Sequence, residues 1–306
     1  MRQDFYYASK GIGLIRGCRW APAGEVKAVV QIVHGVAEHA QRYDEFASFL
    51  NEQGILVVAE DHMGHGKSVE NGGSVGYFDG GWHAAVADTY QLLRDTRALH
   101  PEVPYVLFGH SMGSFMARTI LCDYPDSGIA AAIICGTGWT PEPVLKAGIG
   151  LSRLVCKFGD ERKPGSMLNK MIFGGYNKRI EHLRTSSDWL TRDQEKVDAY
   201  IADPMCGFTA SSGLLRDMMH GISYIQTQDN LDRMDKRLPV LFVAGSDDPV
   251  GNYGEGVKTT VKAFENSGME HVDLKLYPLC RHEIHNEINR QEIYQDLGGW
   301  IKENAL

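Results

Sequence analysis

Short runs of consecutive apolar residues, each bounded by polar or turn-forming residues, recur along this chain. Continuous aliphatic and β-branched runs of this length are typical of strands that are buried on both faces, as in a parallel sheet. The runs lie at 28–33, 55–59, 105–108, 129–135 and 240–244. We therefore expect these five segments to form a mostly parallel sheet.

Between these runs, apolar positions repeat with the period of a helix. Spacings of three or four residues place such side chains on one helical face. The repeats are Tyr43, Phe46, Ala47 and Leu50; Val86, Tyr90 and Leu93; and Ile293, Leu297, Trp300 and Ile301. Alternating strand and helix signals predict an α/β fold, a doubly wound sheet with helices on both faces.

Three further segments have the pattern of strands at the margins of the sheet. Val272, Leu274 and Leu276 alternate with polar residues, which predicts a strand with one wetter face near an edge. Residues 4–8 and 13–20 could pair as an antiparallel edge hairpin.

One interval interrupts the alternation of strands and helices. About 100 residues separate the run ending at Cys135 from the one beginning at Val240, whereas a crossover needs only a dozen or so. This predicts a catalytic core formed by 1–136 and 227–306, with a helical cap at 137–226 inserted as a lid over the substrate site. Its methionine and aromatic residues either pack the cap's own core or line a pocket for an acyl chain.

Composition and charge exclude several classes of protein and of binding partner. The 306 residues are 43% hydrophobic and 23% charged, so we expect a folded protein with a sizeable core. A net charge of −8 without a basic run argues against a nucleic-acid partner and against attraction to anionic membranes. No stretch approaches the roughly 20 apolar residues of a transmembrane helix, and no signal peptide is visible. The six cysteines form no Cys-x-x-Cys pair, so we expect free thiols in a soluble, cytoplasmic protein.

A candidate nucleophile follows the run at 105–108. The motif there is Gly109-His110-Ser111-Met112-Gly113, and a helical stretch, 114–123, comes after it. A Gly-x-Ser-x-Gly sequence between a strand and a helix is typical of a tight elbow that lifts the serine hydroxyl above the sheet. Ser111 is therefore the predicted nucleophile.

A serine nucleophile needs a base and a carboxylate that orients the base. In α/β folds with such a serine elbow, the carboxylate and the base follow the serine along the chain in the order Asp, His. Asp248 comes after the run at 240–244, with Asp247 as the adjacent alternative, and His282 comes after the strand at 272–277, with His285 as a competitor. We favour Asp248 and His282.

An oxyanion hole requires two backbone N–H donors, one from the residue after the nucleophile and one from the loop after an early strand. Met112 supplies the first. The loop His34-Gly35-Val36-Ala37-Glu38-His39 follows the run at 28–33, and Val36 is the predicted second donor. We interpret Glu38 and His39 as residues that hold this loop, since the catalytic positions are already filled.

These motifs, together with Asp61-His62-Met63-Gly64-His65-Gly66-Lys67-Ser68, resemble the α/β-hydrolase fold, and within it the monoacylglycerol lipase and lysophospholipase-like family. The resemblance covers about residues 26–303. It implies that Ser111, Asp248 and His282 form a triad, and that Val36 and Met112 form the oxyanion hole. His34, Gly35, Gly109, His110 and Gly113 would support the loop and the elbow. Ala37 departs from the family, which commonly has glycine there.

The predicted function is hydrolysis of carboxylic esters of an apolar acyl group through an acyl-serine intermediate, without a cofactor. Monoacylglycerols, lysophospholipids and short-chain esters are all candidate substrates. A prolyl-aminopeptidase-like peptidase is an alternative, with Glu161, Glu181, Asp188 or Asp193 available for a substrate amino group. A catalytically silent binding protein is another alternative.

The spacing of His282 and His285 is one residue short of a zinc motif, so we expect no metal site. The oligomeric state is left open.

Overall fold

The computed structural model describes residues 2–306, which form one eight-stranded sheet in the order β1-β2-β4-β3-β5-β6-β7-β8. The strands are β1 (Arg2–Ala8), β2 (Leu14–Trp20), β3 (Ala28–Val33), β4 (Ile55–Asp61), β5 (Tyr105–His110), β6 (Ala131–Cys135), β7 (Val240–Gly245) and β8 (Val272–Tyr277). All neighbouring pairs from β4 to β8 are parallel, whereas β1 and β2 pair antiparallel at one edge. The expected edge hairpin and the edge strand at 272–277 are therefore both confirmed.

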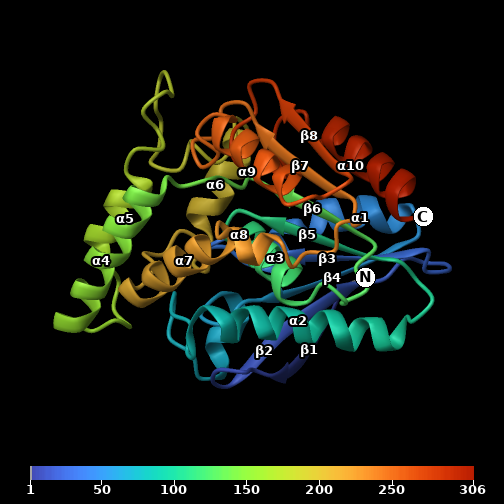
Figure 1. Ribbon diagram of the computed structural model, residues 1–306, viewed down its shortest axis with the longest axis horizontal. Helices are drawn as coiled ribbons and strands as arrows, with labels where there is room; N and C mark the ends of the chain where they lie inside the picture. The colour runs from blue at the N-terminus through green and yellow to red at the C-terminus, as the bar shows by residue number, and fades with distance from the viewer. Residues whose placement is uncertain (1) are drawn as a thin grey trace.

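Helices cover both faces of the sheet (Figure 1). The α-helices are α1 (Asp44–Glu52), α2 (Gly81–Leu99), α3 (Met112–Asp123), α4 (Glu142–Phe158), α5 (Ser166–Phe173), α6 (Gln194–Ala202), α7 (Ser212–Ile225), α8 (Gln228–Leu231), α9 (Glu255–Asn266) and α10 (Arg290–Ala305). The short 3₁₀ helices are η1 (Ala40–Tyr43), η2 (Gly66–Asn71) and η3 (Ile284–Asn286). Buried side chains of α1 and α10 pack on one face, and those of α2, α3 and α9 pack on the other. The α/β class predicted from the apolar pattern is confirmed.

Four of the five strands predicted from apolar runs have bounds that differ from those expected, and two of them, β4 and β7, simply continue to Asp61 and Gly245. β5 continues to His110 because Gly109 and His110 still pair with Ile134 and Cys135 of β6. β6 begins only at Ala131, after the turn that precedes it. β5 therefore ends at the residue immediately before Ser111, and α3 begins at Met112.

The interval between β6 and β7 contains helices α4 to α8 and no strand of the sheet. In Figure 1, α4 and α5 stand apart from the sheet at one end of the molecule. α7 lies closer to the core and packs against α2. Gly221 makes this close approach possible, because a Cβ atom at that position would lie only 2.2 Å from the indole of Trp82. The boundaries 137 and 226 for a separate cap stay a prediction.

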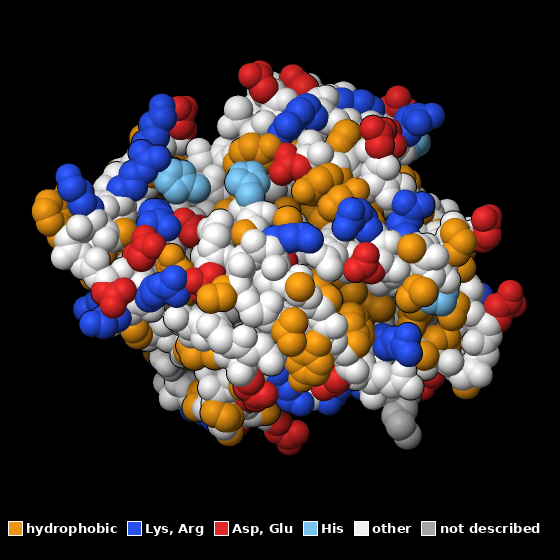
Figure 2. Space-filling model, turned by 90° about the horizontal axis from the view of Figure 1, so that it is seen from below, with side chains coloured by type: hydrophobic (Ala, Val, Ile, Leu, Met, Phe, Trp, Pro, Cys, Tyr) orange, Lys and Arg blue, Asp and Glu red, His pale blue; other side chains and the backbone are white. Residues whose placement is uncertain are grey.

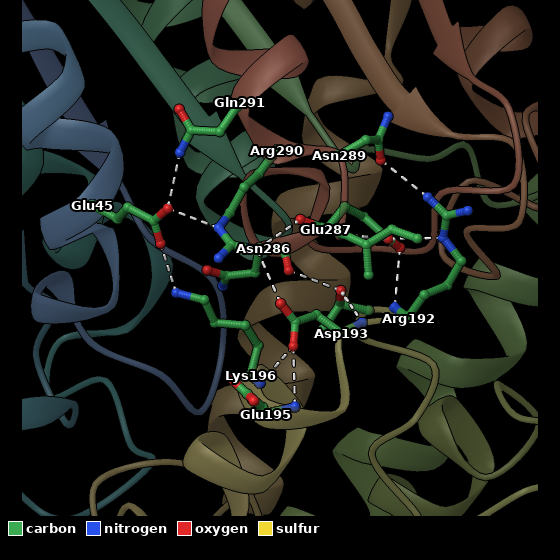
Figure 3. Close-up of polar contacts among 12 residues, drawn as sticks. Glu45, Arg192, Asp193, Glu195, Lys196, Asn286, Glu287, Asn289, Arg290 and Gln291 are labelled. Atoms are coloured by element: carbon green, nitrogen blue, oxygen red, sulfur yellow. Dashed lines mark hydrogen bonds and ion pairs between the residues drawn. The ribbon is translucent and has the colours of Figure 1, made fainter.

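Ion pairs join the start of α6 to the core (Figure 3). Glu45 of α1 accepts from Lys196 and from Arg290, both at 2.8 Å. Arg290 also contacts Asp193 at 2.9 Å, and Asp193 caps α6 by accepting from backbone N–H groups. The segment between β6 and β7 is called the inserted segment from here on. The start of its helix α6 is therefore held against α1 and α10.

A second contact in the same region is more deeply buried. Arg192 donates from Nε to Glu287 at 2.8 Å, and Glu287 is fully buried. The other Glu287 oxygen accepts from the Arg281 backbone N–H at 2.8 Å. The inserted segment is thus attached to the loop that carries His282.

Within residues 2–306, no helix combines the length and the apolar character needed to cross a bilayer.

Candidate active site

Ser111 occupies a strained turn between β5 and α3. Its φ of 54° and ψ of −123° lie outside the regions that L-residues ordinarily adopt. The turn is tight because Gly113 passes so close to β3 that an added Cβ would lie 2.0 Å from the Val33 carbonyl oxygen. Strain of this kind is common where a backbone presents a reactive group. The sharp elbow expected from the glycine pattern is present.

His282 and Asp248 form a buried pair at the carboxyl end of the sheet. The Nδ1 of His282 lies 3.0 Å from each carboxylate oxygen of Asp248, and both side chains are almost completely buried. Burial disfavours the protonated imidazole, but the adjacent Asp248 carboxylate outweighs it and raises the pKa of His282 above its ordinary value. The pair therefore has the geometry of a base oriented by a carboxylate.

The competing residues occupy different surroundings. Asp247 is exposed and accepts a hydrogen bond from Ser246. His285 is buried with its ring stacked on Tyr43 at 4.5 Å, and burial lowers its pKa to about 3. The structure thus brings His282 and Asp248 together and leaves the two alternatives apart from the pair.

The two residues predicted to supply backbone donors border the cavity at Ser111. Val36 and Met112 line the same cavity as Ser111. Within residues 2–306, neither backbone N–H donates a hydrogen bond to another protein group. Unused donors beside a nucleophile are what an oxyanion hole requires.

Glu38 holds the loop that carries Val36. One carboxylate oxygen accepts from the Gly35 backbone N–H at 2.6 Å and lies 3.1 Å from His110 Nδ1. The other oxygen accepts from Arg42 at 2.7 Å. Burial opposes the charge, but His110 and Arg42 outweigh it and keep the pKa of Glu38 well below its usual range. Glu38 therefore has the surroundings of a permanently charged support.

Ala37 adopts a conformation that favours glycine, with φ at 55°. Its carbonyl oxygen accepts from the Gly207 backbone N–H at 2.9 Å and from the Tyr200 hydroxyl at 3.1 Å. Next to it, His39 Nε2 lies 2.8 Å from Asp203 Oδ2. These contacts from the inserted segment hold the loop in the required shape although glycine is absent.

His34 is fully buried beneath the same loop. Its Nε2 accepts from the His62 backbone N–H at 3.1 Å, and its Nδ1 lies 2.7 Å from the Gly35 carbonyl oxygen. Burial, together with repulsion from His62 and His65, keeps the pKa of His34 well below its ordinary value. A neutral His34 with these two contacts can support the loop.

Two hollows meet at Ser111, Val36, Phe173 and Trp189. The first has a volume of about 220 Å³ and is here called the polar pocket because Glu38, His282 and Glu283 border it. Its lining also contains apolar and aromatic side chains, namely those of Phe173, Trp189, Leu190, Tyr200 and Phe208. The second, the apolar pocket, has a volume of about 580 Å³. Its walls come from α3, α4, α5 and α7 and include Phe115, Leu145, Leu151, Met171, Met218, Met219 and Ile222.

Sequence reasoning missed one residue that the inserted segment brings to the site, Trp189, and one residue of the core, Arg42. The Trp189 ring lies 4.9 Å from the His282 ring, and the Trp189 carbonyl oxygen accepts from the His282 backbone N–H at 3.4 Å. Arg42 forms two hydrogen bonds to Glu283, at 2.6 and 2.7 Å, and so connects η1 to the residue after His282. No spacing pattern in the sequence marks either residue.

One group of side chains offers atoms of the kinds that bind metals. Ligand-type atoms of His39, Asp203 and Cys206 lie within 4.8 Å of one another. His39 Nε2 and Asp203 Oδ2 lie 2.8 Å apart, the distance of a direct hydrogen bond. An ordinary polar contact therefore accounts for this group.

Comparisons with known proteins agree with the geometry. A protein-family model described as serine aminopeptidase, S33, matches residues 24–289. The monoacylglycerol lipase of Mycolicibacterium smegmatis is 30% identical over 92% of this chain and 90% of its own length. The monoglyceride lipase of Rattus norvegicus is 26% identical over 98% of this chain and 90% of its own.

A solved structure is also similar over the whole length. It is a thermostable carboxyl esterase from Bacillus coagulans in complex with glycerol, with a TM-score of 0.91 and 29% identity over 100% of this chain and 99% of that one. The resemblance to α/β-hydrolases of the monoacylglycerol lipase type is confirmed.

Proposed function

Because this chain belongs to the α/β-hydrolase family described as serine aminopeptidase, S33, and is a serine hydrolase of carboxylic esters, we propose that its substrates are monoacylglycerols. The observation that carries the proposal is the meeting of an apolar and a polar pocket at Ser111. An ester with a long apolar acyl group and a small polar alcohol matches that pair of pockets.

In the proposed reaction, Ser111 attacks the ester carbonyl while His282 accepts its proton. The Val36 and Met112 N–H groups stabilise the oxyanion, and His282 then protonates the departing alcohol. Asp248 stabilises the imidazolium. Water, deprotonated by His282, finally releases the acid from the serine.

The polar pocket favours glycerol over a phosphate-bearing alcohol. Its volume is small, and none of the residues that line it is Lys or Arg. Glu38 and Glu283 border it and share the single positive charge of Arg42, so the negative charge that remains would repel a phosphodiester. The similar esterase from Bacillus coagulans was solved with glycerol. These observations support a neutral polyol rather than the headgroup of a lysophospholipid.

The peptidase alternative needs an unpaired carboxylate near the substrate. Glu161 accepts from Tyr77 and pairs with Arg216, while Asp188 accepts from Thr185 and from backbone N–H groups. None of the four acidic residues considered for this role lines either pocket. This argues against recognition of a substrate amino group. A catalytically silent protein is disfavoured by the intact Ser111, His282 and Asp248.

We propose that the substrate enters through α4 and α5. Val144, Phe158 and Met171 are 61%, 78% and 62% exposed, and Val144 and Met171 also line the apolar pocket. Residues 141–184 contain nine Lys or Arg and only four Asp or Glu. Figure 2 shows basic side chains gathered at the end of the molecule where Figure 1 places these helices. The expectation of poor attraction to anionic membranes, drawn from the whole-chain charge, does not extend to this segment.

A cytoplasmic location is also part of the proposal. Its support is that all six cysteines are free thiols, which is usual for proteins of a reducing compartment.

Esters that share one acyl chain test the substrate class. We expect turnover of 1-monoacylglycerol to exceed that of the matching lysophosphatidylcholine by at least about 100-fold, and hydrolysis of an aminoacyl amide to be undetectable. Equal rates on the two lipids would refute the headgroup assignment. Preferred cleavage of the amide would overturn the ester assignment.

A pair of variants tests the acyl pocket. Gly148 of α4 lines the apolar pocket and contacts Met219, whereas Gly150 on the same helix has nothing within 4 Å of an added Cβ. Gly148→Leu should lower turnover of long-chain esters about 10-fold or more while acetyl ester turnover persists. Gly150→Leu, the matched control, should leave the chain-length profile unchanged. Unchanged long-chain turnover in Gly148→Leu would refute this placement of the acyl chain.

A further inference from the structure

β8 ends the sheet on the side away from β1, and its outer edge is open. Within residues 2–306, β8 pairs only with β7. Asp273, Leu274 and Lys275 at its centre are exposed. A hollow of about 310 Å³ lies between this end of the sheet and α10, and Lys275 and Tyr277 of β8 line it. An open edge strand is a template for pairing with another chain.

The hydrogen bonds to β7 determine which backbone groups of β8 face outward. The carbonyl oxygens of His271 and Tyr277 accept from Val240 and Ser246, both at 2.9 Å. Odd-numbered residues of β8 therefore bond to β7, because backbone groups of successive strand residues point to opposite sides. The N–H and C=O groups of Val272, Leu274 and Leu276 consequently face away from the sheet.

We propose that two copies of this chain pair through β8 as a homodimer, with a twofold axis at Leu274. A twofold axis makes two identical edge strands antiparallel. Leu274 then pairs with Leu274 of the second copy, and Val272 pairs with Leu276. About six backbone hydrogen bonds would form, all from groups that are free on this edge.

Charge complementarity favours a second copy as the occupant. With the axis at Leu274, Asp273 of each copy lies directly opposite Lys275 of the other. Both side chains lie on the α10 face, where Asp273 accepts from Trp300 at 2.8 Å and Lys275 pairs with Asp296. The dimer would therefore alternate acidic and basic groups across the new strand pair. Opposite charges at facing positions stabilise strand pairs, and like charges destabilise them.

This arrangement has a consequence for the active sites. Ser111, Asp248 and His282 all follow the carboxyl ends of strands, and antiparallel pairing of β8 points those ends in opposite directions. The two α4–α5 surfaces then lie on opposite sides of the dimer. One dimer could apply only one of them to a flat lipid surface at a time.

The first test is the association of the full chain at several concentrations. An interface based on one strand pair is small, so we expect a dissociation constant of about 10–100 µM. Sedimentation velocity should show a monomer at about 1 µM and a dimer at several hundred micromolar. A monomer throughout that range would overturn the proposal.

Leu274→Pro tests the register. Its N–H points outward, so proline removes no hydrogen bond to β7 but blocks the centre of the proposed pairing. The variant should be monomeric at every concentration, with unchanged turnover of a water-soluble ester. A dimer of wild-type affinity would contradict the proposal.

Charge-reversing variants test the predicted contact between Asp273 of one copy and Lys275 of the other. The expected result is restored association on mixing, which a misfolded variant could not give. Asp273→Lys and Lys275→Asp each place like charges opposite one another in their own homodimers, so each variant alone should associate at least about 10-fold more weakly. When the two variants are mixed, each heterodimer again has two pairs of opposite charge. Position 273 of the Asp273→Lys variant faces position 275 of the Lys275→Asp variant, and the unchanged Lys275 of the first faces the unchanged Asp273 of the second. The mixture should therefore form heterodimers. Glu25→Lys, a charge change on an exposed loop, is the control and should dimerise normally. Mixing without heterodimer formation would refute the twofold pairing.

Discussion

The imidazole of His282 presents Nδ1 to both oxygens of Asp248 at 3.0 Å each, and neither side chain is exposed to solvent. This contact leaves Nε2 as the nitrogen available to a serine or to the substrate. It also stabilises a positive charge on a ring that burial alone would keep neutral. The reaction assigned to this site depends on this pair.

Asp248→Asn should lower kcat about 1,000- to 10,000-fold, because the amide neither fixes the correct tautomer nor stabilises the imidazolium. Asp247→Asn is the matched control, since its carboxylate is exposed and bonds only to Ser246. It should retain near-normal turnover of a p-nitrophenyl ester. Greater loss in Asp247→Asn than in Asp248→Asn would show that the wrong aspartate was chosen.

The pH profile should report the raised pKa of His282. The base acts only when deprotonated, so kcat/KM should be low in acid and rise through the pKa, with a midpoint above the ordinary 6.5. In Asp248→Asn the residual activity should have its midpoint at lower pH, because the charge that favours protonation is gone. Measurement of kcat/KM from pH 5 to 9 for both proteins checks this. Identical midpoints would contradict the role assigned to the carboxylate.

Ala37→Gly should stabilise the protein by about 0.5–1 kcal/mol. Alanine at φ 55° is strained, and relief of that strain exceeds the entropy that glycine adds to the unfolded chain. Denaturant unfolding measures the difference. Tyr200→Phe, which removes one of the two donors to the Ala37 carbonyl, should change stability in the opposite direction. If Ala37→Gly lowers the free energy of unfolding, the loop is not strained as described.

The contacts in Figure 3 should differ in their contribution to stability. Glu287 is fully buried and accepts both from Arg192 and from the Arg281 backbone, so Glu287→Gln should cost about 2 kcal/mol. Glu45 is partly exposed, and Glu45→Gln should cost about 0.5 kcal/mol, less at high salt. Equal losses measured by denaturant unfolding would mean that burial does not decide the strength of these contacts.

The sequence predicted well the features that depend on local pattern and chain order. Buried runs indicated the strands, and residues placed after strand ends indicated Ser111, Asp248 and His282, because parallel strands bring their carboxyl ends to one edge. In the structure His282 contacts Asp248, and Ser111 lies on the turn between β5 and α3.

The inserted segment was far less predictable. It has no strand series that would give it a register, so nothing in its sequence shows that Trp189 lies beside His282 or that Tyr200 supports Ala37. Contacts between residues more than 90 positions apart depend on how the segment packs on the core. The positive φ of Ala37 likewise coincides with contacts from Gly207 and Tyr200, which lie far from it in the sequence.

Labelling with a fluorophosphonate probe tests the central claim most directly, since the probe reacts only with an activated serine. The account predicts one equivalent of label, located on Ser111 by peptide mass spectrometry, and complete loss of labelling in Ser111→Ala. Ser114→Ala, which changes a nearby serine that bonds to the Ser111 carbonyl, should still be labelled. Persistent labelling of Ser111→Ala, or no reaction of the wild-type protein, would contradict the assignment of Ser111 as the nucleophile.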